Sequence, residues 1–205
     1  MTRRGAFTVA GAALGGIAGA AVVLPAIGFA VAPLFEEEGD IWQTVGSPAD
    51  FSEDSYKAVV ITAVPDIGAT GKTTAYLRRG SSDLEEDENS YVAISTRCVH
   101  LGCPVRFVKS AGNFLCPCHG GVYDFEGKVI GGPPVRPLDR FQTRVLDPDG
   151  DERQGSPRPG DQVQVGPRFS VTSQLEPVRA RDPGEFTGGI WEYLYPPRPS
   201  VPPAP

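Results

Sequence analysis

Two patterns of apolar residues divide this 205-residue chain. Residues 5–35 form an uncharged and mostly apolar run. Arg3 and Arg4 precede this run, and an acidic stretch, residues 36–40, follows it. Beyond it, short segments rich in β-branched and aromatic residues alternate with clusters of Gly, Pro, Asp and Ser. About 20 apolar residues span a bilayer as a helix, and short segments between turn residues are typical of strands. The pattern therefore predicts one membrane helix followed by an all-β head.

The N-terminal run is longer than the apolar core of a cleavable signal, which has about 7–15 residues, and this favours a retained single-pass anchor over residues 1–35. Ala30-Val31-Ala32 resembles a cleavage site, so removal of the signal stays the alternative. Arg3 and Arg4 on one side of the run predict a cytoplasmic N-terminus and a head on the outer face of the cell membrane.

The paired arginines also resemble a twin-arginine export signal, which carries an already folded head across the membrane. Ala6 stands where that motif usually has Phe, and the alternative is that the arginines only set topology. Gly11, Gly15 and Gly19 form two Gly-x-x-x-Gly steps, which either let another helix approach closely or reflect an Ala/Gly-rich export sequence. We expect Pro25 to kink or end the helix.

The segments after the neck, residues 36–40, predict an antiparallel β-sandwich or partly open barrel over residues 41–166. The 25 glycines and 21 prolines of the chain suit such short strands and loops. Residues 167–205 form a Pro-rich C-terminal extension, whose aromatic trio either packs on its own head or docks on a neighbouring subunit: Trp191, Tyr193 and Tyr195. We expect strands over residues 56–64, 73–77, 91–95, 105–108, 113–115, 141–146 and 162–165.

Charge excludes one class of partner. The formal net charge is −6, and residues 1–35 carry only Arg3 and Arg4, so the remainder is more acidic still. An acidic head argues against nucleic-acid binding, which needs a basic surface. The acidic run 83–88 lies between two predicted strands; we interpret it as a solvated turn, with a docking patch for a basic partner as the alternative.

All four cysteines and both histidines lie between positions 98 and 119, in two boxes, 98–103 and 116–121. Each box holds a Cys and a His at close range and one further Cys. A structural zinc site spaces its four ligands differently and leaves two cysteines over. Two structural disulfides leave the repeated Cys/His pairing unexplained. A [2Fe–2S] cluster with two thiolates on one iron and two imidazoles on the other uses the residue types that the boxes offer.

These boxes and the residues that follow them closely resemble the Rieske iron–sulfur family. The resemblance covers the cluster region fully and the rest of the chain in outline, and it rests on Cys98, His100, Gly102, Cys103, Cys116, Pro117, Cys118, His119, Gly120, Tyr123, Asp124, Gly132, Pro133 and Pro134. It implies that one [2Fe–2S] cluster is bound by Cys98, His100, Cys116 and His119. It also implies a disulfide between Cys103 and Cys118, a pair that respiratory quinol-oxidising members carry and ring-hydroxylating oxygenases usually lack.

The chemistry of such a ligand set suits quinol oxidation. Neutral imidazoles in place of two thiolates remove negative charge and raise the reduction potential. Each imidazole keeps a second ring nitrogen, whose pKa should rise when the cluster gains an electron, so an electron and a proton are taken together. By resemblance, His119 hydrogen-bonds the quinol and accepts its proton, while Leu101 and the Gly132-Pro133-Pro134 loop shield the cluster.

The resemblance implies a membrane-anchored subunit of a quinol:cytochrome c oxidoreductase of the cytochrome bc family, with a cytochrome b-type subunit and a c-type cytochrome as partners. One alternative is the small Rieske subunit of an arsenite oxidase, which also carries an export signal. Another, of a different class, is a redox-inactive binding domain stabilised by disulfides.

One position departs from the family. Many high-potential members have Ser directly after the second box, where this chain has Gly121, and by resemblance that hydroxyl donates a hydrogen bond to a cluster sulfur. Tyr123, the second such donor, is present. Loss of a donor lowers the potential, which suits menaquinol; the alternative is that a backbone N–H replaces the hydroxyl at Gly121.

Overall fold

The structure is a computed structural model that describes residues 2–31, 42–63, 68–80, 91–153, 155–187 and 190. The chain falls into two compact units, Met1–Glu38 and Gly39–Pro205. The expected neck (36–40), the acidic run (83–88) and the aromatic trio (191, 193 and 195) lie outside the described residues.

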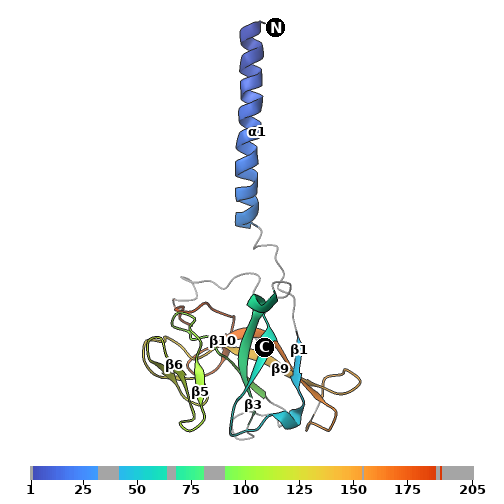
Figure 1. The fold of residues 1–205 in the computed structure, drawn as a ribbon, viewed down its shortest axis with the longest axis vertical. Coiled ribbons are helices and arrows are strands. Elements are labelled where there is room, and N and C mark those ends of the chain that lie inside the picture. The colour runs from blue at the N-terminus through green and yellow to red at the C-terminus, as the bar shows by residue number, and fades with distance from the viewer. Residues whose placement is uncertain are drawn as a thin grey trace. The chain divides into compact units, whose positions relative to one another are not determined.

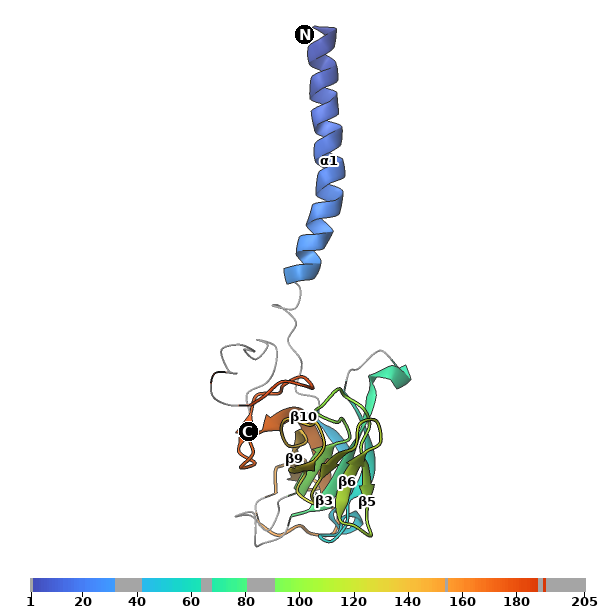
Figure 2. The same cartoon turned by 90° about the vertical axis from the view of Figure 1, so that its left-hand side faces the viewer.

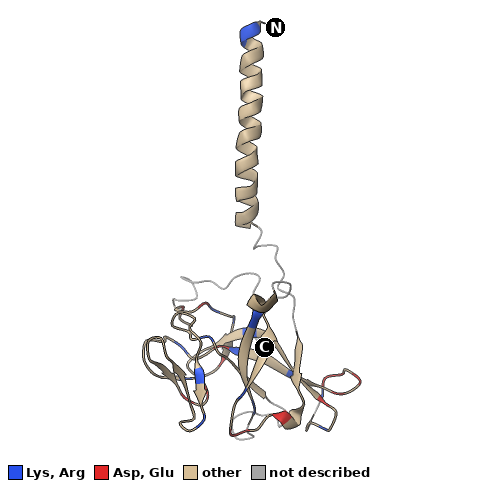
Figure 3. Ribbon diagram, viewed as in Figure 1, with Lys and Arg blue, Asp and Glu red and all other residues tan. Residues whose placement is uncertain are grey.

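The first unit is the helix α1, Arg3–Val31. It has 29 residues, none of them buried, and among the described residues it is the one helix long and apolar enough to cross a membrane. Its only charged residues lie at its N-terminal end (Figure 3). The helix continues through Pro25, so the alternative that it ends there is wrong. Its length and composition are those of a single-pass membrane anchor.

The second unit is the all-β head, whose strands form two antiparallel sheets that stand beside each other (Figure 1). The large sheet has the order β1-β10-β9-β4-β3-β2, with β11 paired to β10. Its strands are β1 (Gln43–Gly46), β2 (Lys57–Thr62), β3 (Lys72–Arg79), β4 (Tyr91–Ser95), β9 (Arg140–Leu146), β10 (Gln162–Val171) and β11 (Pro177–Val178). Two short 3₁₀ turns, Pro48–Asp50 and Gly68–Gly71, precede β2 and β3.

The small sheet has the order β5-β6-β7-β8. Figure 2 shows its strands β5 and β6 on the side that faces the viewer. Its strands are β5 (Arg106–Val108), β6 (Asn113–Cys116), β7 (Gly121–Tyr123) and β8 (Val129–Gly131). The strands follow one another through tight connections, so this sheet is a meander. Both cysteine boxes lie at its ends, the first before β5 and the second between β6 and β7.

Strand β4 belongs to both hydrophobic cores of the head. Tyr91 and Ala93 lie in the first core, inside the large sheet, whereas Val92 and Ile94 lie in the second core, next to the small sheet. Successive side chains of a strand point to opposite faces, so a strand between two cores must be apolar on both. All five residues of β4 are buried, which explains why this segment lacks polar alternation.

A buried cation joins the two sheets. Arg78 on β3 donates to Glu126 Oε1 at 2.8 Å and to the Tyr56 hydroxyl at 3.0 Å. Its guanidinium lies 5.1 Å from the centre of the Phe125 ring. Because Glu126 follows β7, this pairing connects the large sheet with the sheet that carries the boxes.

All seven predicted strands are confirmed, and the expected antiparallel β head is confirmed with them. Prediction missed β1, β7, β8 and β11, each of which has four residues or fewer. It also ended the last long strand at Val165, whereas β10 continues to Val171. The sheet therefore includes residues that we expected in the C-terminal extension.

Candidate metal centre

Three loops carry the residues that the sequence singled out. The first loop, residues 96–105, connects β4 to β5; the second loop, residues 117–120, connects β6 to β7; the third loop, residues 132–139, connects β8 to β9. Each loop is anchored at both ends by a strand. Strand β4 of the large sheet therefore fixes the start of the first loop, and strands of the small sheet fix its end and both ends of the second loop.

The first loop is closed by its own backbone. The N–H of Cys98 donates to the carbonyl of Cys103 at 2.8 Å, and the N–H of Gly102 donates to the carbonyl of Cys98 at 2.8 Å. Gly102 has a φ of +82°, in the left-handed region that favours glycine. Cys98 is buried, His100 is half-buried and Leu101 is exposed. The loop thus keeps the Cys98 thiol inside and the Leu101 side chain outside.

The second loop is the turn of a β-hairpin. Cys116, the last residue of β6, pairs with Gly121, the first residue of β7. Gly120 has a φ of +69°, which lets the chain turn back within the loop. The Cys116 side chain is buried, whereas Cys118 and His119 are exposed. One turn thereby offers an inner thiol and an outer imidazole.

The two boxes meet in space. The rings of His100 and His119 lie edge to face, with centres 5.0 Å apart. The sulfur atoms of Cys103, Cys116 and Cys118 all lie within 4.8 Å of one another. The contact with the Cys103 side chain raises the pKa of the Cys118 thiol to about 11.

Tyr123 on β7 contacts the first loop. Its hydroxyl oxygen lies 3.1 Å from the Cys98 sulfur and accepts a hydrogen bond from the N–H of Val99 at 3.3 Å. The hydroxyl has one proton, so this arrangement leaves that proton for the sulfur. Burial raises the pKa of Tyr123 and also that of the Cys98 thiol. Where Cys98 is a thiolate ligand, the phenol would be the donor in this contact.

The third loop touches the second through glycine. A Cβ atom at Gly132 would lie 2.4 Å from the carbonyl oxygen of Gly120, and its φ of +85° also favours glycine. A Cβ atom at Gly121 would lie 2.8 Å from Cγ of the buried Pro134. No other residue type fits at Gly132 without moving backbone, while Pro133 stays exposed at the end of the loop. Pro134 fills the space that a side chain at Gly121 would need.

The donor set fits the implied cofactor. Two buried thiols, Cys98 and Cys116, and two adjacent imidazoles, His100 and His119, are brought together by two loops whose glycines allow close approach. Thiolates and imidazoles in this number are the ligands of a Rieske [2Fe–2S] centre. The Tyr123 hydroxyl next to the Cys98 sulfur supplies a donor of the kind that tunes such clusters.

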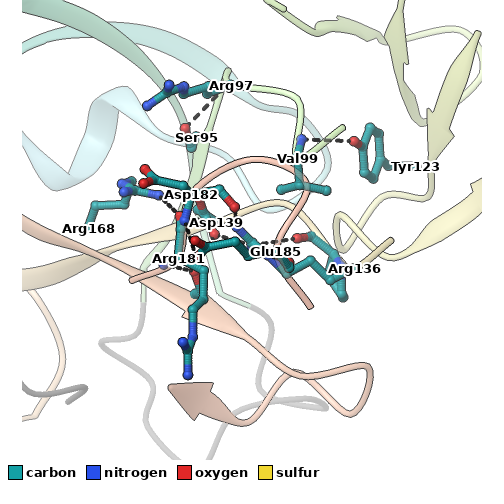
Figure 4. Close-up of polar contacts among 12 residues, drawn as sticks. Ser95, Arg97, Val99, Tyr123, Arg136, Asp139, Arg168, Arg181, Asp182 and Glu185 are labelled. Atoms are coloured by element: carbon teal, nitrogen blue, oxygen red, sulfur yellow. Dashed lines mark hydrogen bonds and ion pairs between the residues drawn. The ribbon is translucent and has the colours of Figure 1, made fainter. Parts of the chain in front are cut away.

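Sequence reasoning missed a group of polar residues behind the first loop. Figure 4 shows Arg136 and Asp139 of the third loop among Arg168, Arg181 and Glu185. Arg136 and Asp139 are buried, although isolated charged residues in a loop ordinarily indicate solvent exposure. Only the approach of the C-terminal part of the chain makes their burial possible, and no spacing in the sequence signals it.

Comparison with known proteins identifies the domain. Residues 41–142 match the family described as the Rieske [2Fe-2S] domain. The iron-sulfur subunit of the menaquinol:cytochrome c reductase of Bacillus subtilis is 30% identical over 141 residues, which cover 65% of this chain and 80% of that protein.

Other relatives match over the cluster region only. A cytochrome b6-f complex iron-sulfur subunit of Chlorobaculum tepidum is 41% identical over 58 residues, 28% of this chain and 32% of that protein. A carotenoid phi-ring synthase of the same organism is 49% identical over 55 residues, which span 27% of this chain and 8% of the synthase. The chain therefore spans less than a third of the length of these two proteins.

Among solved structures, the cyanobacterial plasma membrane Rieske protein from Synechocystis PCC 6803 is 24% identical, with a TM-score of 0.39 over 60% of this chain and 97% of that one. This likeness is too low to carry a functional statement. The family match and the Bacillus relative suffice: the chain belongs to the Rieske family, and its cofactor is a single [2Fe–2S] cluster.

Proposed function

We propose that this chain is the membrane-anchored electron-transfer subunit of a quinol:cytochrome c oxidoreductase of the bc type. The observation that carries the proposal is the exposed ring of His119 beside the half-buried ring of His100. A ligand at the surface lets a substrate reach the redox centre without entering the head. The length of the match to the menaquinol:cytochrome c reductase subunit supports the same assignment.

We assign the cluster ligands to the four residues that the two boxes bring together: Cys98, His100, Cys116 and His119. In the Rieske arrangement two cysteines bind one iron and two histidines bind the other. The cluster, when bound, supplies a one-electron acceptor. His119 carries the catalytic role, because its exposed ring can accept a hydrogen bond from the quinol hydroxyl and then hold the proton at the nitrogen that is not bound to iron.

Cys103 and Cys118 are assigned to a disulfide that joins the first loop to the second. Their sulfur atoms already belong to one close group, and neither residue is needed as a ligand. A bridge here closes a loop that contains β5 and β6. Together with the exposed Leu101 and the Pro133–Pro134 segment, it keeps the two boxes in place around the cluster.

The partners follow from the proposed reaction. A cytochrome b-type subunit provides the quinol site in the membrane, and a c-type cytochrome takes the electron. The helix α1 anchors the subunit, with its N-terminal arginines in the cytoplasm and the head on the outer face, in accordance with the positive-inside rule. The arsenite oxidase alternative finds no support in the relatives described above, which are subunits of quinol- or cytochrome-linked complexes or a carotenoid enzyme.

Menaquinol is the substrate that we favour. Gly121 provides no hydroxyl to a cluster sulfur, and Pro134 fills the space beside it, so Tyr123 is left as the side-chain hydroxyl at this end of β7. Fewer donors to the cluster stabilise the added electron less and lower the reduction potential. A low-potential cluster matches a low-potential quinol.

The function is tested by co-purification. A tagged full-length chain, solubilised in mild detergent from its own membranes, should carry with it a b-type haem visible in the reduced spectrum. The complex should reduce cytochrome c when menaquinol is added. Untagged membranes serve as the control. Recovery of a molybdenum-containing subunit without b-type haem would favour the arsenite oxidase alternative instead.

The ligand assignment predicts the effect of four single substitutions, Cys98→Ala, His100→Ala, Cys116→Ala and His119→Ala. Each should abolish the electron-spin-resonance spectrum of the Rieske cluster, because an iron loses one of its two protein ligands. Val60→Ala, a change at an exposed aliphatic residue of β2, is the control and should keep the spectrum. A normal cluster signal in His100→Ala would refute the assignment.

The disulfide assignment predicts that mass spectrometry of the oxidised, unreduced chain finds Cys103 and Cys118 in one linked peptide pair. Their replacement by Ser should lower the free energy of unfolding by about 3 kcal/mol, the value expected for a loop of this length. Denaturation in urea measures this loss. Two alkylatable thiols at these positions in freshly purified, oxidised protein would contradict the bridge.

The Gly121 hypothesis predicts that a serine raises the reduction potential, provided that Pro134 is trimmed to make room for it. Gly121→Ser in a Pro134→Ala background should have a higher midpoint potential than Pro134→Ala alone. One neutral hydrogen bond is worth roughly 1 kcal/mol, so the rise should be on the order of tens of millivolts for a one-electron couple. An unchanged or lowered potential would mean that a backbone N–H already fills the role of the hydroxyl.

A further inference from the structure

The C-terminal part of the head turns back to the first loop. Residues 181–187, here named the strap, follow β11 and lie outside the segment matched by the family. The N–H of Gly184 donates to the carbonyl of Val99 at 2.6 Å. A Cβ atom at Gly184 would lie 3.4 Å from the carbonyl oxygen of His100, and one at Gly102 would lie 3.6 Å from Cγ of Pro183. The strap therefore contacts the stretch between Cys98 and Cys103.

A buried guanidinium holds the strap. Arg136 is 3% exposed and donates through Nε to the carbonyl of Glu185 at 3.0 Å. Its Nη2 atom donates to the carbonyls of Arg181 and Asp182 at 3.3 and 3.4 Å. One side chain of the third loop thus binds three backbone carbonyls of the strap. Inside the strap, the N–H of Asp182 donates to Glu185 Oε2 at 3.0 Å, which closes a turn.

Asp139 joins this group to the large sheet. Its carboxylate is 2% exposed and pairs with Arg136 and Arg168. It also accepts a hydrogen bond from the Ser170 hydroxyl at 2.7 Å, and that hydroxyl accepts one from the N–H of Arg181 at 2.8 Å. Arg168 donates to the carbonyl of Arg181 at 2.9 Å. The strap is therefore tied to β10 as well as to the third loop.

The charges explain why the strap stays in place. One buried carboxylate, that of Asp139, pairs with the guanidinium groups of Arg136 and Arg168. A buried charge is stable only when its hydrogen-bonding groups have partners. The carbonyls of the strap accept hydrogen bonds from the N–H groups of Arg136 that do not reach Asp139. Removal of the strap would leave these N–H groups without their acceptors.

We propose that the strap is a positioning element of the redox centre, which fixes the first loop from behind through the Gly184 hydrogen bond and thereby orients His100. Arg136 and Gly184 are its positioning residues. This inference rests on the assignment of Cys98 and His100 as ligands, but the contact between strap and loop stands without it.

The test compares two shortened forms of the cluster-loaded, membrane-anchored chain, one ending at Thr187, which keeps the strap, and one ending at Arg179, which lacks it. Hydrogen exchange of the Cys98 and Gly102 amides reports on the first loop, because both amides bond within that loop. Without the strap, exchange at these amides should accelerate by at least about tenfold, the factor that corresponds to one lost hydrogen bond. The amides of β4 should be unchanged, and the g-values of the reduced cluster should shift.

Three results would each overturn the proposal. Amide exchange could be unchanged at Cys98 and Gly102, or it could accelerate equally in the first loop and in β4. The third is an unaltered cluster spectrum although exchange in the first loop has accelerated. If the shorter chain does not fold, Gly184→Ala carries the same test, because Gly184 has a φ of +85° and lies against His100. Gly150→Ala is its matched control: Gly150 has a φ of +93° with no atom within 4 Å of its added Cβ. Only the Gly184 variant should loosen the loop and shift the spectrum, and the same result in both variants would overturn the proposal.

A wrong ligand assignment gives a different result. In that case His100→Ala keeps a normal cluster spectrum, while the effect of the strap on amide exchange in the first loop persists. The exchange measurement is therefore independent of which residues bind iron, and the two proposals fail separately.

Discussion

The burial of β4 on both of its faces is the constraint on which the rest of the head depends. A strand that lies between two cores is shielded from solvent on both faces. Each large aliphatic side chain that it buries contributes about 1.5–3 kcal/mol to the free energy of folding. Tyr91 and Ala93 hold the strand to one core, and Val92 and Ile94 hold it to the other. The first loop begins directly after this strand, so its starting point is fixed from two directions. A shift of β4 by one residue along its neighbours would exchange its two faces, so burial on both faces prevents the shift. The start of the first loop, which carries two of the four proposed ligands, is thereby held in one position.

Around this strand, the head combines rigid backbone contacts with buried charge. At the end of the small sheet, Gly121 and Gly132 let the second and third loops approach to distances that no side chain would permit. Behind the loops, Arg78 with Glu126 and Arg136 with Asp139 connect elements that are distant in sequence. Buried ion pairs contribute little net stability, but they are costly to break, so they define one arrangement of the elements they join. The positions of the loops are thus set by close glycine contacts between the second and third loops and by the two buried ion pairs.

The sequence predicts those features whose cause is local. The apolar run of α1 and the β-branched segments of β2, β4 and β9 follow from composition and turn residues, and the two boxes mark the site by residue type and spacing. The short strands β7 and β8 escape prediction because three residues are too few to show alternation, and they acquire their pairing only from neighbours. The strap and the contact between Gly121 and Pro134 depend on tertiary packing, which has no periodic signature. The candidate ligands can be predicted from residue type and spacing, whereas the contacts that hold their loops from behind cannot.

The hydrogen bond between Gly184 and Val99 has a consequence for the biogenesis of the protein. A ribosome makes the chain from its N-terminus, so the boxes emerge well before the residues that complete the packing behind them. Contacts of large sequence separation form late, and the first loop cannot reach its final form until the C-terminal part of the head has been made. If the strap positions the first loop as proposed above, iron and sulfide reach their final geometry only after the whole head has been synthesised. For the topology proposed above, with the head on the outer face, this order favours an export route that accepts a finished domain over one that threads an unfolded chain across the membrane.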